Sequence, residues 1–126
     1  MVVVLEDDPR LRSALCLLLS DWEFRTVEGA NAVEALAHIG AAVRDVIAVI
    51  TDFDLGAGLN GIDEVSALRE AGVAAPVLVI SGSMRGRAGE LAKQAGFHFL
   101  SKPVKPFGHR ELADLARRLS IPARRA

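Results

Sequence analysis

The 126-residue sequence has a single cysteine, almost no net charge and no long hydrophobic run. Because Cys16 has no second cysteine to pair with, an internal disulfide is excluded and a reducing, cytoplasmic location is expected. Fifteen basic and sixteen acidic residues leave a net charge of −1, which provides no general attraction to nucleic acid or to an anionic membrane. The first apolar run, Val2 to Leu5, is far too short for a signal peptide or a membrane span.

No internal repeat and no linker-like segment divides the chain. With 51% hydrophobic and 25% charged residues, it has the composition of one globular domain whose core is large enough to fold without disulfide or metal cross-links. We expect this domain to cover residues 1–121 and a short tail to cover residues 122–126. We expect a monomer or a weak dimer.

One apolar segment, residues 46–50, is followed directly by Thr51, Asp52, Phe53 and Asp54. A short run of aliphatic residues without polar alternation predicts a central strand that is buried on both faces. Asp52 then lies at the carboxyl end of this strand. In an open parallel sheet, ligands bind at that edge, which makes Asp52 a candidate site residue.

Strand and helix patterns alternate along the rest of the chain. The other strands are expected at residues 2–5, 24–27, 77–80 and 97–101, and helices at 9–22, 31–39, 61–70, 87–95 and 107–119. Asp8 before Pro9, and Asn31 three residues before Glu34, are helix-start signals, and Gly40 is an end signal. Five strands interleaved with five helices predict a parallel sheet with helices on both faces.

Helical spacing also predicts which side chains face the core. These are Leu11, Leu15, Leu18 and Trp22 in the first helix, Val33, Leu36 and Ile39 in the second, and Ile62, Val65 and Leu68 in the third. Cys16 is most simply an inert residue of the first helix.

Polar side chains follow four of the five predicted strands. They are Glu6 and Asp7 after the first strand, Asp52 and Asp54 after the third, Ser81 after the fourth and Lys102 after the fifth. Carboxylates crowded at one sheet edge repel one another, and a divalent cation would remove this cost. Ligand sets made only of oxygen favour Mg²⁺. Lys102 could pair with Asp52 or a bound phosphoryl group, and Ser81 could donate a hydrogen bond to the same oxygens.

This set of residues, in this order and at the strand ends, resembles the response-regulator receiver family of two-component signalling. Residues 55–61 form a long loop without proline, which resembles receivers fused to the C-terminus of hybrid histidine kinases. The resemblance covers nearly the whole chain and implies an α/β, flavodoxin-like (βα)5 three-layer sandwich, with five parallel strands in the order 2-1-3-4-5.

The resemblance also implies a role for each site residue. Asp52 would accept a phosphoryl group from a histidine kinase or histidine phosphotransfer protein, in a self-catalysed signalling reaction rather than in metabolism. Asp7 and Asp52 would bind Mg²⁺ directly, Glu6 would bind it through water and Asp54 through its main-chain carbonyl. The switch would consist of Ser81 and Phe99, which lacks a tyrosine's hydroxyl, and a cis peptide would join Lys102 to Pro103.

Three residues of the first helix, Arg10, Ala14 and Leu17, share one flank at positions i, i+4 and i+7. The simplest interpretation is that Leu17 is a scattered surface leucine, which is common. The functional interpretation is a docking ridge for a helical partner, as the first helix provides in the receiver family.

Two other functions remain open from the sequence. Asp52-Phe53-Asp54 resembles the Asp-x-Asp signature of haloacid-dehalogenase-like phosphohydrolases, although that motif belongs on a first strand and here follows the third. A pseudo-receiver that binds partners without phosphorylation would carry the same residues. Gly56, Gly58 and Gly61 match a dinucleotide-binding spacing, but carboxylates precede them and they are not in the first βα turn, so we interpret them as loop glycines.

Overall fold

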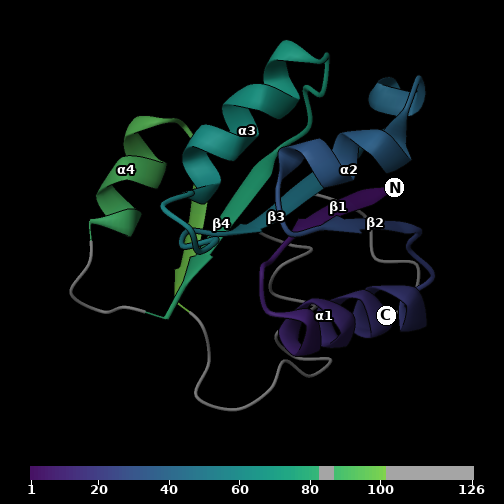
Figure 1. Ribbon diagram of the computed structural model, residues 1–126, viewed down its shortest axis with the longest axis horizontal. Helices are drawn as coiled ribbons and strands as arrows, with labels where there is room; N and C mark the ends of the chain where they lie inside the picture. Colours follow the sequence, from purple (N-terminus) through teal and green to yellow (C-terminus); the bar gives the residue numbers. More distant parts are fainter. Residues whose placement is uncertain (83–86, 102–126) are drawn as a thin grey trace.

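A five-stranded parallel sheet forms the centre of the computed structural model, which describes residues 1–82 and 87–101 (Figure 1). The strands are β1 (Val2–Leu5), β2 (Thr26–Gly29), β3 (Ala48–Asp52), β4 (Val77–Ser81) and β5 (His98–Ser101). Their order in the sheet is β2-β1-β3-β4-β5, and every neighbouring pair is parallel. The predicted flavodoxin-like order is therefore confirmed.

Helices cover both faces of this sheet (Figure 1). Helix α1 (Pro9–Asp21) packs on one face, and α2 (Ala32–Ile39), α3 (Gly61–Glu70) and α4 (Ala88–Gln94) pack on the other. A short 3₁₀ helix, η1 (Ala42–Asp45), precedes β3. The helix expected at residues 107–119 and the tail at 122–126 lie outside the described residues.

Strands β1, β3 and β4 are buried on both faces, which explains why the sequence shows apolar runs rather than alternating apolar and polar residues. Successive side chains of a strand point to opposite faces, and both faces of this sheet are covered. In β1, Val2 and Val4 join the core on the α1 side, whereas Val3 and Leu5 join the core beneath α2 and α3. All residues of β1, β3 and β4 are buried.

The predicted helix signals act as expected. The side chain of Asp8 accepts a hydrogen bond from the Arg10 amide at 2.9 Å, and that of Asn31 accepts one from the Glu34 amide at 2.9 Å. Both bonds satisfy amides that the first turn of a helix leaves unpaired. Gly40 ends α2 with a φ of 56°, a conformation that favours glycine.

One predicted core stripe is confirmed and extended, and another needs correction. In α1, Leu15 and Trp22 are buried and Leu11 and Leu18 pack partly buried against the same core, as predicted, and Cys16 and Leu19 are buried as well. Burial is also the main reason that the pKa of the Cys16 thiol is raised to about 11, which keeps the thiol protonated and unreactive at neutral pH.

In α2 the predicted inward residue Val33 is 76% exposed, and Leu36 is only partly buried. The buried positions are instead Ala32, Ala35 and Ile39. Their spacing is helical too, so periodicity alone could not choose between the two stripes. Small alanine side chains allow the helix to lie close to the sheet, which turns Val33 toward solvent.

The second strand also differs from its prediction. The sequence pattern placed it at residues 24–27, but β2 covers Thr26–Gly29 because Val2 of β1 pairs with Thr26 and Leu5 pairs with Gly29. Phe24 is buried in the core on the α1 side, yet it precedes the strand. Within the described part of the chain, no helix combines the length and the hydropathy needed to cross a membrane.

Candidate functional site

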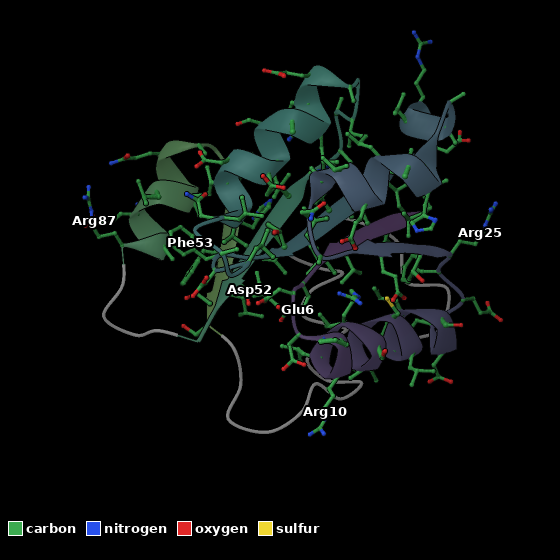
Figure 2. All side chains as sticks on the ribbon, viewed as in Figure 1. Glu6, Arg10, Arg25, Asp52, Phe53 and Arg87 are labelled. Atoms are coloured by element: carbon green, nitrogen blue, oxygen red, sulfur yellow. The ribbon has the colours of Figure 1, made fainter. Side chains whose placement is uncertain are left out.

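Strand register brings the predicted site residues to one edge of the sheet. Leu5 of β1 pairs with Thr51 of β3, so Glu6 and Asp52 follow at the same level on neighbouring strands. Asp52 in turn pairs with Ile80 of β4, which places Ser81 one residue further along the same edge. Figure 2 shows Glu6 and Asp52 close together at this end of the sheet. The predicted convergence is thus present.

Three carboxylates form a tight cluster at this edge. One oxygen from each of Glu6, Asp7 and Asp52 lies within 4.8 Å of the other two. Only 1% of Glu6 and 6% of Asp52 is exposed, whereas Asp7 faces solvent. The cluster forms part of a pocket of about 370 Å³ whose lining also includes Asp8, Asp54 and Ser81.

The chemistry of this cluster fits a hard divalent cation. All donors are oxygens, which suit Mg²⁺. Their separations of at most 4.8 Å let one ion lie within reach of all three, either directly or through a coordinated water molecule. A bound cation would also offset the repulsion between them.

Asp52 forms hydrogen bonds through both its side chain and its main chain at the end of β3. The Asp54 amide donates a hydrogen bond to its Oδ1 at 3.4 Å, and the Thr51 hydroxyl donates one to its main-chain carbonyl at 2.9 Å. Helix α3 begins at Gly61, directly against this carbonyl, where a Cβ atom would find no room. The Gly61 amide donates to the Phe53 carbonyl at 2.7 Å, which ties the start of α3 to the strand end.

A compact loop, residues 55–60, borders the pocket through Gly56. Its ends are joined by a bridge between Asp54 and Asn60 and by a hydrogen bond from the Leu55 amide to the Leu59 carbonyl. Gly56, Ala57 and Gly58 have φ values of 74°, 51° and 80°, all in the left-handed region.

Gly56 was expected from the sequence only to be a loop glycine, but its position also brings it close to the acidic cluster. A Cβ atom on Gly56 would lie 2.8 Å from Oδ2 of Asp7. The main chain of the loop therefore approaches a candidate metal ligand closely. The spacing of glycines after a strand was the available signal, because close backbone approach to a polar site is one common reason for glycine.

The remaining predicted residues lie as follows. Phe99 of β5 is partly buried, and its ring lies near Gly89 of α4, where an added Cβ atom would come within 3.4 Å of it. On α1, Arg10 and Leu17 are exposed and Ala14 is half-buried. Lys102, and with it the expected cis peptide to Pro103, lies outside the described residues.

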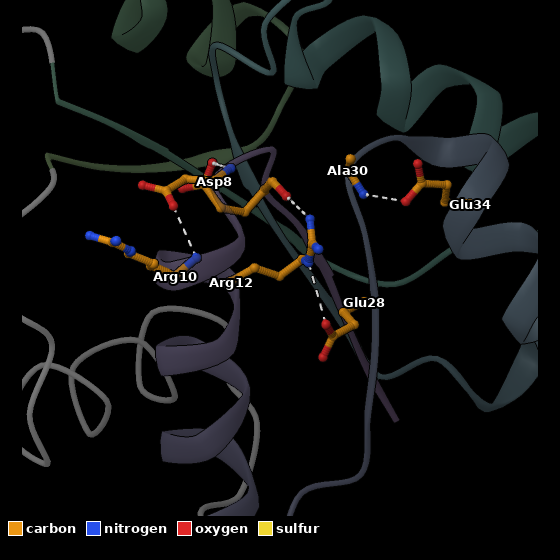
Figure 3. Close-up of polar contacts among 7 residues, drawn as sticks. Asp8, Arg10, Arg12, Glu28, Ala30 and Glu34 are labelled. Carbon is orange, nitrogen blue, oxygen red and sulfur yellow. Dashed lines mark hydrogen bonds and ion pairs between the residues drawn. The ribbon is translucent and has the colours of Figure 1, made fainter.

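Arg12 contacts the main chain of the site, although no sequence pattern marked it as a site residue. Its Nη1 donates a hydrogen bond to the main-chain carbonyl of Glu6 at 2.7 Å, and its Nε lies 3.3 Å from Oε1 of Glu28. Figure 3 shows its side chain reaching from α1 to Glu28 on β2. An arginine in the first turns of a helix carries no signal for such contacts, because they depend on the tertiary position of the neighbouring strands.

The family model for the response regulator receiver domain matches residues 2–115 of this sequence. Fold, site geometry and sequence thus agree, and the chain belongs to the response regulator receiver domain family of two-component signalling. The resemblance to the response-regulator receiver family is therefore confirmed. No curated protein sequence matches the chain.

Solved structures with the same fold include several receiver domains. The receiver domain of NtrX from Brucella abortus is 26% identical, with a TM-score of 0.76 and coverage of 97% of this chain and 100% of that one. CheY4 of Vibrio cholerae is 22% identical, with a TM-score of 0.76 and coverage of 94% and 96%. The receiver domain of RstA from Klebsiella pneumoniae, crystallised in a BeF3-activated form, is 22% identical, with a TM-score of 0.72 and coverage of 94% and 97%.

Proposed function

We propose that this receiver domain is a phosphoacceptor in a two-component phosphorelay and that Asp52 receives the phosphoryl group. The observation that carries this proposal is the position of Asp52 at the end of β3, inside a pocket that it shares with Glu6, Asp7 and Ser81. The family assignment supports it, since receivers of this family act with histidine kinases or phosphotransfer proteins. The family does not favour the phosphohydrolase alternative.

The chemistry assigned to Asp52 is nucleophilic. A carboxylate oxygen of Asp52 attacks the phosphorus of a phosphohistidine, a new O–P bond forms, and the P–N bond breaks as the imidazole leaves. The product is an aspartyl phosphate. In this proposal Ser81, which ends β4, donates a hydrogen bond to a phosphoryl oxygen, and Lys102 is the expected second donor.

A divalent cation is the cofactor that this pocket suits. We propose that Asp7 and Asp52 hold Mg²⁺ directly, with Glu6 acting through water and Asp54 through its carbonyl. When bound, the ion would neutralise charge on the transferring phosphoryl group.

Phosphorylation of the site would change the surface of the domain through Ser81 and Phe99. We propose that Ser81 moves toward the phosphoryl group and that Phe99 turns inward, which changes the surface of α4 and β5. Phe99 lies on β5 two residues before Ser101, which pairs with Ser81 of β4, so the two proposed switch residues occupy neighbouring strands.

The phosphodonor would dock on α1. Arg10, Ala14 and Leu17 lie one to two turns apart on this helix, and α1 begins next to the acidic pocket. Leu17 is 71% exposed, so it supplies the apolar centre that a transient contact needs. The expected absence of nucleic acid and membrane partners and the cytoplasmic location stay predictions.

The test is phosphorylation of the whole chain by a small acyl phosphate with Mg²⁺, followed by mass measurement of the intact protein. A lasting adduct of one phosphoryl group is expected for the parent, and none for Asp52→Asn, because this change removes the nucleophile. Asp45→Asn is the matched control, since this exposed aspartate lies outside the pocket and the variant should still be labelled. Circular dichroism checks that each variant folds.

Other outcomes contradict the proposal in different ways. Turnover of the acyl phosphate without an adduct would indicate a phosphohydrolase. No reaction of the folded parent, even with excess Mg²⁺, would indicate a pseudo-receiver. Labelling of Asp52→Asn at the parent's rate would show that another residue is the acceptor.

A further inference from the structure

Arg12 connects three elements that meet beside the acidic pocket. It extends from α1 to the loop after β1, where its Nη1 donates to the Glu6 carbonyl, and to β2, where its Nε pairs with Glu28 (Figure 3). Only 19% of its side chain is exposed. The guanidinium is therefore held in place between these elements.

The carbonyl that Arg12 holds belongs to the peptide bond between Glu6 and Asp7. Because a peptide unit is planar, fixing its oxygen restricts the main chain that carries both carboxylates. On the other side, the Glu6 amide donates to the Gly29 carbonyl of β2 at 3.1 Å. A charged donor makes the Arg12 bond stronger than one between neutral groups.

Glu28 in turn holds Arg12. The Arg12 side chain is long, and ordering it costs rotamer entropy, which a second contact helps to offset. The planar guanidinium can serve the Glu6 carbonyl and the Glu28 carboxylate at the same time, which a lysine ammonium cannot do with the same geometry. Glu28 is about half-exposed, so its pairing should be the weaker of the two contacts.

We propose that Arg12 is a positioning residue of the cation site and that it keeps the carboxylates of Glu6 and Asp7 directed toward Asp52. This inference rests on the proposed function, because it assigns Arg12 a role within the same site. Arg12 itself does not touch the cation or the phosphoryl group.

The sign of its effect on Mg²⁺ affinity distinguishes positioning from simple electrostatics. If Arg12 acted only as a nearby positive charge, its removal would make the pocket more negative and tighten Mg²⁺ binding. If it positions the two carboxylates, its removal weakens binding, because the ligands are no longer held together. The two explanations therefore predict opposite changes.

The experiment measures the Mg²⁺ dissociation constant of the whole chain by isothermal titration calorimetry. Loss of a residue that orients metal ligands typically weakens metal binding by about 10- to 100-fold, and we expect Arg12→Ala to fall in this range. Arg12→Lys should recover part of the loss, because it keeps the charge and one donor. Glu28→Gln should cause a smaller loss, because the bond to the Glu6 carbonyl remains.

Arg69→Ala is the matched control. Arg69 Nη1 also donates to main-chain carbonyls, those of Val73 at 3.1 Å and Ala75 at 2.7 Å, but it lies outside the acidic pocket. Its removal should reduce stability and leave Mg²⁺ affinity unchanged. Equal weakening in Arg69→Ala and Arg12→Ala would mean that general destabilisation explains both effects, and it would overturn the inference.

The inference and the proposed function can fail separately. Folded Arg12→Ala that binds Mg²⁺ as tightly as the parent, or more tightly, overturns the role of Arg12 even if Asp52 is phosphorylated. A parent that binds Mg²⁺ but accepts no phosphoryl group overturns the function alone. If Arg12→Ala does not fold, Arg12→Lys and Glu28→Gln decide the question, and parent-like affinity in both overturns the inference.

Discussion

Neighbouring residues at the end of β1 have opposite environments. Glu6 is almost completely buried, and the Asp8 amide lies 3.5 Å from its Oε2, whereas Asp7 is exposed. A buried carboxylate needs polar partners, while an exposed one remains accessible to a ligand from solvent. Asp7 therefore lies at the entrance of the pocket, and Glu6 lies beneath it.

Gly56 should affect Mg²⁺ binding at the proposed cation site, because it lies close to the Asp7 carboxylate. A methyl group at this position would meet Asp7 Oδ2 at 2.8 Å, and the flexible Asp7 side chain would turn away from Glu6 and Asp52 to avoid it. We expect Gly56→Ala to weaken Mg²⁺ binding about tenfold, which corresponds to about 1.4 kcal/mol. Calorimetric titration with Mg²⁺ would measure the change.

Gly58→Ala separates this contact from backbone strain. Gly58 has a φ of 80°, close to the 74° of Gly56, but nothing lies within 4 Å of the position of its missing Cβ. Both variants should lose about 1–2 kcal/mol of unfolding free energy from the left-handed conformation. Only Gly56→Ala should lose Mg²⁺ affinity, and equal affinities would argue against a role for this contact.

At the scale of elements, α1 has two distinct faces. Leu15, Cys16 and Leu19 are buried against the sheet, whereas Leu17 lies on the opposite side of the helix and is exposed. Figure 2 shows Arg10, at the start of the helix, pointing away from the molecule. The outer face is thus available for a partner without disturbing the core.

Leu17→Glu should slow phosphoryl transfer from the histidine kinase or phosphotransfer protein that labels the parent. A buried carboxylate in the centre of the contact would cost about 1.4 kcal/mol or more, so we expect at least a tenfold loss of transfer efficiency. Labelling by a small acyl phosphate should stay near the parent's rate, because it needs no docking. Rates measured with both donors would provide the comparison.

Val33→Glu is the control for this experiment. Val33 is as exposed as Leu17 but lies on α2, on the other face of the sheet, so the change adds the same charge away from the proposed docking surface. Transfer to this variant should match the parent. If Val33→Glu and Leu17→Glu slow transfer equally, docking does not depend on α1.

At the scale of the whole molecule, bringing the three carboxylates of the site together costs electrostatic free energy. Folding brings the carboxylates of Glu6, Asp7 and Asp52 to within 4.8 Å of one another. Charges about 4 Å apart repel by about 4 kcal/mol at an effective dielectric constant of 20, before solvent and relaxation reduce the cost. Binding a cation that is absent from the unfolded chain would recover stability.

Asp52→Asn should therefore stabilise the metal-free protein, by about 1 kcal/mol or more, because one of three crowded charges is removed. Urea unfolding in the presence of EDTA would measure this gain. At a Mg²⁺ concentration of about 100 times the parent's dissociation constant, the parent should gain about 2.7 kcal/mol, so the difference should shrink or reverse. Asp45 is an exposed aspartate outside the pocket. Asp45→Asn should therefore have the same unfolding free energy as the parent, both in EDTA and with Mg²⁺.

Local pattern alone determined most of the elements. The bounds of β1 and α3 match their predictions, and Asp52 ends β3 as expected, because these segments carry strong local signals at both ends. The parallel sheet and its strand order were likewise predictable, and with them the convergence of Glu6, Asp7, Asp52 and Ser81. This follows from alternation of strands and helices together with the family resemblance.

Tertiary structure alone decided the features that depend on contacts between distant segments. The register of β2 was set by pairing with β1, and the inward stripe of α2 by how closely its alanines approach the sheet. Arg12 bonds to groups 6 and 16 residues away, and Gly56 approaches Asp7 across two separate loops. Periodicity records only neighbours along the chain, so it contains no information on such contacts, which arise when the sheet places separate segments side by side.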